Sequence, residues 1–339
     1  MGVPDMRIAV VALEGCTPIA PIGAAELLRK SARIHMERTG DTQPPFTIEL
    51  VSIAPHTLQF DDGYAIACHK TLDQVHDIDL LLIPAIEFDI EAKLQTNAAA
   101  VPQIKRLYDA GAAVGSMCTG SFLLAATGLL NGRRATTHWA MAAQFRRMYP
   151  DVQLEDERII IDNGRLYCAG GATSFMNLVL YLVEKHCGRA TAIAASQMLL
   201  IDYAKPAQSL YAVFSPLLNH GDEAIAALQH SVLESENRLV TVQGLAHQAH
   251  MTTKTLTRRF KAATGQTPSQ FIRRAGVERA KRMLETSNLT FEQIALRLGY
   301  SDIGSLRNIF KQLTSLTPTA YRRRYRHGYQ ALYRREASS

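Results

Sequence analysis

The sequence predicts two domains of different fold class: an α/β doubly wound domain and, after it, an all-α domain with two helix-turn-helix motifs. Strand-length apolar segments alternate with amphipathic helical patterns between residues 6 and 190, as in a parallel sheet with helices on both faces. A second, purely helical pattern occurs twice near the C-terminus. At 339 residues the chain is long enough for each domain to have a core of its own.

The first domain begins with a strand and alternates from there. We expect a buried strand at 8–13, further strands at 46–52, 80–83 and 112–117, and helices at 22–35, 102–110 and 121–127. The strand at 112–117 runs into the next helix through Cys118, Thr119 and Gly120. Small residues at this junction allow a sharp turn, in which a strained elbow residue displays its side chain at the sheet edge where ligands bind. We therefore expect Cys118 to face a ligand pocket.

The surroundings of Cys118 lack the partners that a nucleophilic cysteine needs. Activation of a thiol requires a lowered pKa or a neighbouring base. Related hydrolases often have histidine directly after the cysteine, whereas this chain has Thr119. The resemblance to such proteins implies Glu14 and His138 as the candidates for an acid and a base, and it places Ile86 at the strand end that usually offers the oxyanion hole. We expect a ligand pocket without catalysis, formed by Cys118, Thr119, Gly120, His138, Ile86 and Glu14.

The second domain contains an internal repeat. Its copies are GLAHQAHMTTKTLTRRFKAATGQTP at 244–268 and QIALRLGYSDIGSLRNIFKQLTSLTP at 293–318. Leu256 and Phe260 correspond to Leu306 and Phe310, with one extra residue near Gly304. Such self-similarity indicates that one supersecondary unit is used twice.

Each copy predicts a helix-turn-helix motif. The helical pattern breaks at 250–251 in the first copy and at 299–300 in the second. Thr252 and Ser301 follow these breaks and are suited to cap the second helices. In such a motif the second helix enters the major groove of DNA.

The second helix of each motif is therefore expected to turn its polar side chains to DNA and its apolar ones to the core. The outward set is Thr253, Lys254, Thr257 and Arg258 in the first copy, and Asp302, Ile303, Ser305, Arg307 and Asn308 in the second. The inward set is Leu256, Phe260, Leu306 and Phe310. Arg322, Arg323 and Arg324 follow the second motif, and we expect them to lie along DNA phosphates.

The charge of the chain is divided in the same way. From residue 225 onward there are 19 Lys and Arg against 7 Asp and Glu, a net charge of +12. The whole chain carries +6, so residues 1–224 carry −6. A basic segment joined to an acidic one is typical of a nucleic-acid-binding domain attached to a domain with another role. The charge thus supports double-stranded DNA as a partner of the second domain.

The second domain resembles the DNA-binding domain of the AraC family of bacterial transcription regulators. The resemblance rests on the two copies of the repeat and on the closing AYRRRYR at 320–326. Asn308 stands where the family usually has arginine, and Ser315 stands where a helix-ending glycine is usual. The resemblance implies that Ser315 adopts the left-handed backbone of a helix cap.

The first domain resembles the DJ/PfpI-type branch of the class I glutamine amidotransferase-like fold, which has a flavodoxin-like architecture. The motifs are GSMCTGSFLLAATGLLNGRRATTHW at 115–139 and AGGATSFMNLVLYLVEKHCG at 169–188. The pairing of both halves is similar to AraC-family regulators with an amidotransferase-like sensor. This resemblance implies a first domain that binds a small, often nitrogen-containing metabolite and mediates dimerisation.

No cofactor, metal site or membrane segment is expected. Five cysteines without CxxC spacing fit reduced thiols instead of a disulfide framework or a zinc site. The glycine pair at 170–171 is expected to allow a close backbone approach, since no Lys-Ser/Thr follows it as in a phosphate loop. Because the sequence shows neither a signal pattern nor the roughly 18 to 20 apolar residues of a membrane span, we expect a cytoplasmic location.

The expected domains are a sensing and dimerisation domain at 1–212, a connector at 213–221, a DNA-binding domain at 222–327 and a C-terminal tail at 328–339. A helical pattern is expected to continue over 193–211, with breaks at 205–206 and 215–216. Asp222 is expected to cap the first helix of the DNA-binding domain.

The expected function is that of a sequence-specific DNA-binding transcription regulator that responds to a small-molecule effector bound near Cys118. We expect it to be a homodimer and an activator, with RNA polymerase as a further partner. Two alternatives stay open: a cysteine-dependent amidase or hydrolase fused to a DNA-binding domain, and a constitutive DNA-binding protein whose first domain only dimerises.

Overall fold

The computed structural model describes residues 6–53, 57–60, 63, 65–203, 207–214, 216, 218–235 and 240–326. Tertiary contacts divide the chain into two units, Met1–Gln208 and Ser209–Ser339. Each unit has hydrophobic cores of its own. The tail predicted at 328–339 lies outside the described residues.

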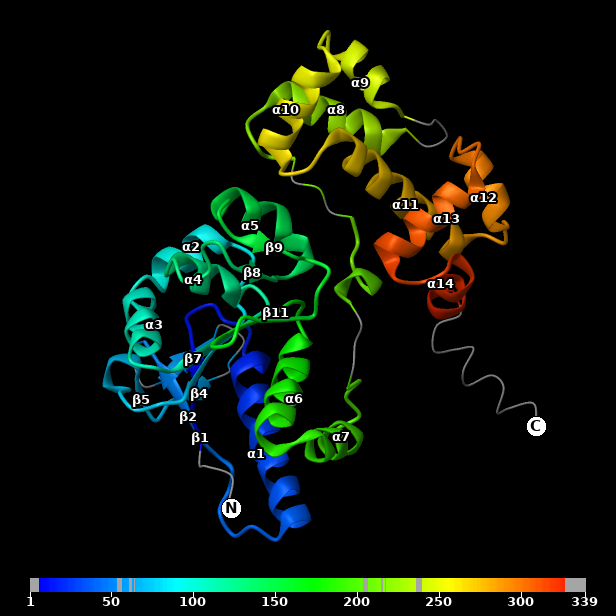
Figure 1. The fold of residues 1–339 in the computed structure, drawn as a ribbon. Coiled ribbons are helices and arrows are strands. Elements are labelled where there is room, and N and C mark those ends of the chain that lie inside the picture. The colour runs from blue at the N-terminus through cyan, green and yellow to red at the C-terminus, as the bar shows by residue number, and fades with distance from the viewer. Residues whose placement is uncertain are drawn as a thin grey trace, which may run out of the picture. The chain divides into compact units, whose positions relative to one another are not determined.

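The first unit is built on a seven-stranded sheet (Figure 1). Its strands are β1 (Met6–Ala12), β2 (Phe46–Ser52), β5 (Lys70–Thr71), β6 (Leu80–Ile83), β7 (Ala113–Met117), β10 (Ile160–Asp162) and β11 (Leu166–Ala169). Their order is β10-β11-β7-β6-β1-β2-β5, and every pair is parallel except β10 with β11. Two short ladders accompany the sheet: β3 (Thr57–Gln59) with β4 (Ala65–Ala67), and β8 (Arg134–Ala135) with β9 (Gln153–Leu154).

Helices cover both faces of this sheet, as the doubly wound prediction requires (Figure 1). One layer consists of α1 (Ile19–Thr39), α6 (Ser174–Cys187) and α7 (Arg189–Met198), and the other of α2 (Ile90–Thr96), α3 (Ala100–Asp109), α4 (Gly120–Ala126) and α5 (Ala142–Met148). Successive side chains of a strand point to opposite faces. Ile8 and Val10 of β1 accordingly pack into one core, and Ala9 and Val11 into the other.

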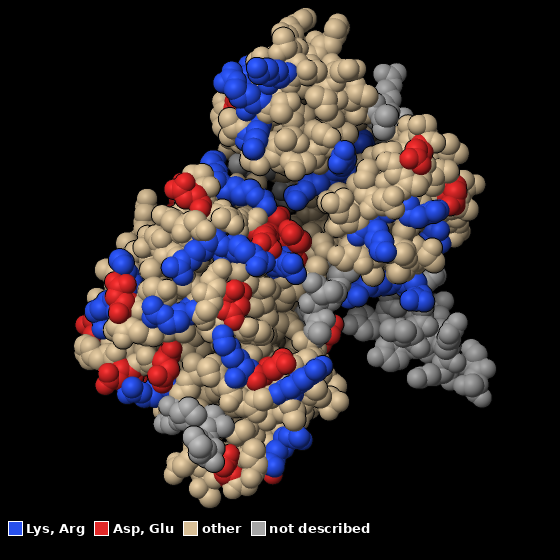
Figure 2. Space-filling view, viewed as in Figure 1, with Lys and Arg blue, Asp and Glu red and all other residues tan. Residues whose placement is uncertain are grey.

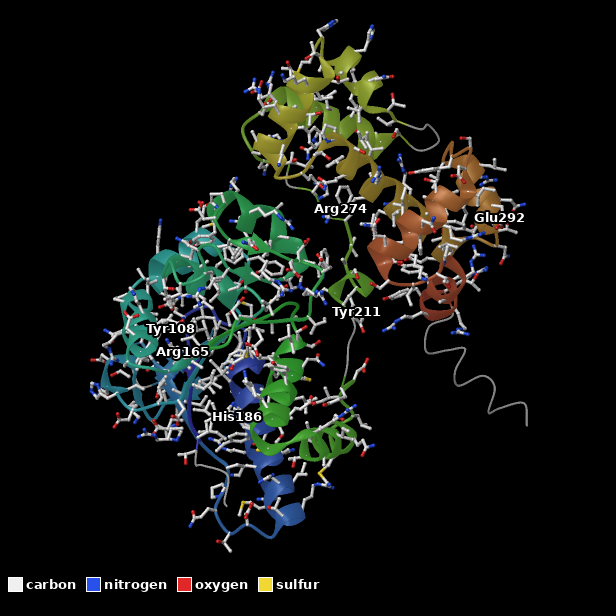
Figure 3. All side chains as sticks on the ribbon, in the orientation of Figure 1. Tyr108, Arg165, His186, Tyr211, Arg274 and Glu292 are labelled. Carbon is white, nitrogen blue, oxygen red and sulfur yellow. The ribbon has the colours of Figure 1, made fainter. Side chains whose placement is uncertain are left out.

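A contact between Arg165 and Tyr108 joins two segments of the first unit. The Arg165 guanidinium, just before β11, lies 4.2 Å from the centre of the Tyr108 ring of α3 (Figure 3). The same guanidinium donates to Tyr108 O at 2.9 Å. This contact joins the start of β11 to the end of α3, two segments that flank β7.

The helix predicted at 193–211 is wrong in extent. α7 ends at Met198, and Leu200 has a φ of 52°, a left-handed backbone that an α-helix does not contain. The Ile201 N–H instead donates to Ser196 O at 2.9 Å, which closes the helix end. A short 3-10 helix, η3 (Gln208–Leu210), follows.

The second unit is helical (Figure 1). Its helices are α8 (Glu223–Glu234), α9 (Val242–Gln248), α10 (Thr253–Thr264), α11 (Pro268–Thr286), α12 (Phe291–Arg297), α13 (Ile303–Thr314) and α14 (Pro318–Tyr325). Asp222 caps α8 as predicted, because its side chain accepts from the Ile225 N–H at 3.2 Å. Two cores form along α11, one around Phe260 and the other around Phe310.

The segment before α8 packs on this second unit. The ring of Phe214 lies 5.1 Å from that of Phe271 in α11. Nζ of the buried Lys281 donates to Ala212 O at 2.8 Å. Part of the segment expected to be a connector is therefore held against α11.

Candidate functional site

The elbow predicted after β7 is present. Cys118 has a φ of 56°, a left-handed backbone that a residue other than glycine rarely adopts. Its N–H donates to Ala169 O at 2.7 Å, which ties the elbow to β11. A Cβ at Gly120 would lie 2.3 Å from Pro84 O. The sharp turn between β7 and α4 therefore requires glycine at this position.

The thiol at this elbow is covered, contrary to the expectation that it faces a ligand pocket. Cys118 is 4% exposed and packs against Ala20 of α1 and Ala85, which follows β6. Burial raises the pKa of Cys118 to about 11, although hydrogen bonds from Thr119 act in the opposite direction. The thiol stays protonated at neutral pH, and a protonated thiol is a poor nucleophile.

The Thr119 hydroxyl is hydrogen-bonded to the backbone amide of Ile86, which an oxyanion hole would use. Its Oγ1 accepts from the Ile86 N–H at 2.9 Å and donates to Ile86 O at 2.5 Å. Thr119 is completely buried. A substrate carbonyl could reach this amide only by displacing the hydroxyl, so the arrangement favours a closed site over a catalytic one.

His138 lies at the start of η2 (Trp139–Met141) and caps it. Its Nδ1 accepts from the Ala140 N–H at 3.2 Å, and burial lowers the pKa of His138. The ring is therefore neutral at neutral pH, with its proton on Nε2. The rings of Phe88 and Trp139 lie 5.3 and 5.2 Å from it. These contacts give His138 a capping and packing role.

Two hydroxyls that were not predicted lie next to the Cys118 carbonyl. Ser121 Oγ lies 2.9 Å from Cys118 O, Thr137 Oγ1 lies 3.4 Å from it, and the two hydroxyls are 2.7 Å apart. Ser121 could have been found from its spacing three residues after the elbow. Glu14, by contrast, is exposed, and its backbone N–H donates to Asn97 Oδ1 at 3.1 Å.

The two helix-turn-helix motifs are α9 with α10 and α12 with α13. The first helices, α9 and α12, have 7 residues each, and the second helices, α10 and α13, have 12 residues each. Leu256, Phe260, Leu306 and Phe310 are fully buried, as predicted. Ser315 has a φ of 59° and ends α13 in the left-handed conformation that Gly265 provides for α10, which confirms that prediction.

The turn of the second motif is one residue longer than that of the first. Helices α9 and α12 start 49 positions apart, at 242 and 291, whereas α10 and α13 start 50 positions apart, at 253 and 303. The extra residue therefore lies in the turn and not near Gly304. The prediction that Ser301 caps α13 was wrong, because Asp302 is the N-cap and makes no cap hydrogen bond. Thr252 does cap α10, accepting from the Thr255 N–H at 3.1 Å.

The outward side chains of α10 are accessible to solvent. Thr253, Lys254 and Arg258 are exposed. Thr257 is partly buried, and its Oγ1 donates to Thr253 O at 2.8 Å. Lys254 and Arg258 therefore supply the positive charge of this face.

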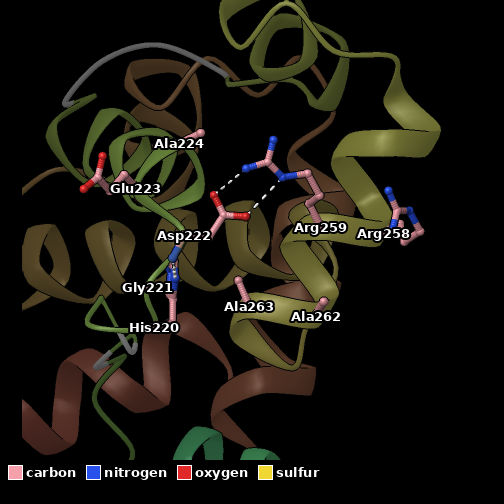
Figure 4. A pocket seen from close by; sticks show the side chains of 9 residues that line it. All are labelled: His220, Gly221, Asp222, Glu223, Ala224, Arg258, Arg259, Ala262 and Ala263. Carbon is pink, nitrogen blue, oxygen red and sulfur yellow. Dashed lines mark hydrogen bonds and ion pairs between the residues drawn. The ribbon is translucent and has the colours of Figure 1, made fainter.

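Two neighbouring arginines of α10 have different environments. Arg259 pairs with Asp222 at 2.7 Å, which joins α10 to the start of α8. Figure 4 shows Arg258 projecting from α10 away from this pair, at the rim of a hollow lined by residues 220–224, 258, 259, 262 and 263. The structural arginine and the exposed arginine are thus adjacent in sequence but separate in role.

The outward face of α13 carries less positive charge. Asp302, Ser305, Arg307 and Asn308 are exposed and Ile303 is partly buried. Arg307 forms an ion pair of 2.8 Å with Glu292 on α12. Asn308 occupies the position that Arg258 has in α10. This face therefore has one paired arginine where α10 has a lysine and an arginine.

The closing arginines also differ from one another. Arg322 donates to Leu284 O in α11 at 3.2 Å and to Leu289 O, which follows α11. Arg323 and Arg324 are exposed, and Arg324 donates to the Tyr211 hydroxyl at 3.0 Å. On the face drawn in Figure 2, the helical unit carries several groups of Lys and Arg side chains and few acidic ones.

In the part of the chain that the structure describes, none of the helices has the length and the apolar composition to cross a membrane. Within the same residues, no group of three or more His, Cys, Asp or Glu side chains is placed to hold a metal ion.

Comparisons with known proteins match both units. The DJ-1/PfpI family model matches residues 6–185, and a helix-turn-helix domain model matches residues 245–324. The HTH-type transcriptional regulator CdhR of Pseudomonas aeruginosa is 26% identical over 291 residues, which cover 85% of this chain and 83% of that protein. Isonitrile hydratase of Pseudomonas putida is 38% identical over 82 residues, 23% of this chain and 33% of that enzyme. A crystal structure from Vibrio parahaemolyticus has the same fold over 57% of this chain and 99% of its own, with a TM-score of 0.51 and 24% identity.

Proposed function

This chain belongs to the DJ-1/PfpI family and joins that domain to an AraC-type helix-turn-helix domain, and from this premise we propose that it regulates transcription in response to a small molecule. Its similarity to HTH-type transcriptional regulators identifies it as a DNA-binding transcriptional regulator. The finer proposal is that it activates transcription as a homodimer and contacts RNA polymerase, with its effector bound near Cys118.

The observation that carries the proposal is the pair of exposed second helices, α10 and α13. Both expose polar side chains on one face and bury a leucine and a phenylalanine on the other. A helix held in this way can enter the major groove, where Arg258 can bond guanine. We propose that Lys254 and Arg258 are the main DNA contacts and that Ser305, Arg307 and Asn308 read a second groove segment.

The position of the elbow supports an effector site near Cys118. Cys118 follows β7, Ile86 follows the neighbouring β6, and Cys16 follows β1, so three parallel strands end here. Ligands of open α/β sheets bind at this edge. The protonated thiol and the engaged Ile86 amide support a site that binds a ligand without transforming it.

Footprinting on a promoter that the protein recognises tests the proposed DNA contacts. One protomer should protect two successive major-groove segments about one helical turn, or roughly 34 Å, apart. Arg258→Ala should weaken protection of the first DNA segment, and Arg307→Ala should weaken protection of the second. A single short protected segment that both variants weaken equally would contradict the proposal. Effector response is then measured as a change in the same footprint when a candidate metabolite is added.

A further inference from the structure

Residues 209–214, which begin the second unit, form a strap on its helices. At the first end of the strap, Ser209 Oγ lies 2.8 Å from Oγ of Ser315, which ends α13. The hydroxyl of Tyr211 accepts from Nη2 of Arg324 in α14 at 3.0 Å. Both contacts are exposed to solvent. Because water can replace an exposed hydrogen bond, these contacts contribute little net free energy, and this end of the strap is easily released.

The other end of the strap is held by buried groups. Lys281 of α11 is 5% exposed, and its Nζ donates to Ala212 O at 2.8 Å and to Glu278 Oε2 at 2.9 Å. Glu278 Oε2 also accepts from the Phe214 N–H at 3.2 Å, and the Phe214 ring packs on Phe271. Release of this end would deprive a buried ammonium of an acceptor, which is costly. The strap is therefore fixed at 212–214 and detachable at 209–211.

The detachable end directly follows an anchored residue of the first unit. Gln208 is the last residue of that unit and is 2% exposed. Its side-chain amide donates to Thr137 O at 2.9 Å and to Asp156 O at 3.0 Å. Thr137 also adjoins the elbow, since its hydroxyl lies 3.4 Å from Cys118 O. A rearrangement at the elbow that moves Gln208 therefore pulls on 209–211.

The group that the detachable end holds is the guanidinium of Arg324. Arg324 is exposed and is one of the closing arginines that were expected to lie along DNA phosphates. Besides the hydrogen bond to Tyr211, its guanidinium lies 5.3 Å from the centre of the Tyr211 ring and 5.8 Å from that of Tyr325. A cation within about 6 Å of an aromatic ring is attracted to it. A phosphate must therefore draw Arg324 away from these partners before it can bind.

We propose that the contact between Tyr211 and Arg324 is autoinhibitory. While 209–211 are docked, Arg324 is withheld from a DNA phosphate, and release of this end supplies the phosphate contact. The gain in affinity is the same for every base sequence, because phosphate contacts carry no sequence information. The strap thereby couples the state of the first unit to DNA affinity. The inference rests on the proposed function, because it describes how the affinity of the regulator for DNA is controlled.

The test compares the affinity of full-length variants for two labelled duplexes, a promoter that the protein recognises and a random sequence. Fluorescence anisotropy is measured over a range of NaCl concentrations. Tyr211→Phe removes the hydroxyl and should tighten binding to both duplexes by about two- to tenfold, as expected when one exposed hydrogen bond no longer competes. The log-log salt slope should become steeper by up to about 0.9. Tyr203→Phe is the matched control, because the Tyr203 hydroxyl donates to Glu184 in the first unit, and it should leave the affinity unchanged.

A double-mutant cycle assigns the gain to Arg324. Arg324→Ala should abolish the gain of Tyr211→Phe, and it should cost less affinity in the wild type than in the Tyr211→Phe background. A gain in affinity cannot arise from a variant that fails to fold. The inference is overturned if Tyr211→Phe binds the random duplex no more tightly than the wild type does, or if Arg324→Ala costs the same in both backgrounds.

The two duplexes separate this failure from that of the proposed function. A wild type that does not prefer the promoter to the random sequence contradicts sequence-specific regulation, whatever the Tyr211 variants do. A selective wild type whose Tyr211→Phe variant binds no more tightly contradicts only the autoinhibitory strap.

Discussion

The turn before α4 and the turn before α10 have similar backbone conformations. The side chains that they position, Cys118 at the elbow and the outward residues of α10, differ in burial and charge. Each helix start follows a residue other than glycine in the left-handed region, with φ of 56° at Cys118 and 52° at His250. At the elbow the thiol is buried and protonated at neutral pH. On α10 the charged groups of Lys254 and Arg258 are exposed.

A strained turn therefore does not by itself identify a catalytic residue. The turn fixes where a side chain points, and the residues packed around it decide whether that side chain can ionise. Ala20 and Ala85 cover Cys118, and Thr119 uses the nearest amide. Nothing comparable covers the described face of α10, so its charges can meet DNA.

The largest effect is expected where the elbow is most tightly packed. Gly120→Ala places a Cβ 2.3 Å from Pro84 O, so it should lower the free energy of unfolding by about 1 to 3 kcal/mol. Gly304→Ala is the matched control, because its Cβ would meet only the Asp302 side chain, at 3.2 Å. This control should be neutral or stabilising by up to about 1 kcal/mol, since alanine favours a helix. Calorimetry distinguishes them, and equal midpoints would show that the elbow is not tightly packed.

The DNA-binding face should respond unequally in its two halves. Arg258→Ala should weaken specific binding by about 1 to 3 kcal/mol, because an exposed arginine can bond a base edge without losing a protein partner. Arg307→Ala should have the smaller effect, since Arg307 must first leave Glu292. Glu292→Gln should strengthen binding by up to about 1 kcal/mol. Fluorescence anisotropy measures all three, and a larger loss for Arg307→Ala would contradict the assignment of the main contact to α10.

Removing the residue that caps a recognition helix should have a smaller effect on stability. Thr252→Ala should lower the stability of the second unit by about 1 kcal/mol, because its hydroxyl accepts the Thr255 N–H. Asp302→Ala should change stability less, since Asp302 makes no cap hydrogen bond. Urea unfolding followed by circular dichroism compares the two variants. If the aspartate variant lost as much as the threonine variant, the difference between the two turns would be mistaken.

The smallest effect concerns the closing arginines. Arg323→Ala should reduce the log-log salt slope of DNA binding by about 0.9, as expected when one phosphate contact is lost. Arg322→Ala should instead lower the unfolding midpoint, because Arg322 bonds the carbonyls of Leu284 and Leu289. If the Arg323→Ala variant kept the wild-type salt slope, Arg323 would not contact a phosphate.

Local features of this fold could be predicted from the sequence. The strands at 46–52 and 80–83 have the predicted bounds: the first largely alternates apolar and polar residues, and the second is an uninterrupted apolar run. The four buried residues of the recognition helices follow from spacing alone. The position of the extra residue could not be predicted, since either Ser301 or Asp302 can precede a helix and only the observed helix start decides between them.

Long-range features of the site could not be predicted. The covering of Cys118 depends on Ala20, which lies almost a hundred positions earlier and reaches the elbow only through the packing of α1. Gln208 is 71 positions from Thr137, and no local pattern marks it as a neighbour of the elbow. The ion pair of Arg307 likewise requires α12 and α13 to be placed first.

The most direct test of this account is the ionisation of Cys118 in the folded protein. The rate of iodoacetamide alkylation at this cysteine is measured by mass spectrometry of its peptide across pH, with the urea-unfolded chain as reference. Because burial raises the pKa of Cys118 from 9.0 to about 11, the folded rate should rise only above pH 9, and the folding stability that this thiol contributes should fall between pH 9 and about 11. An inflection below pH 8 in the folded protein would reveal an activated thiolate and contradict the account of a binding site without catalysis.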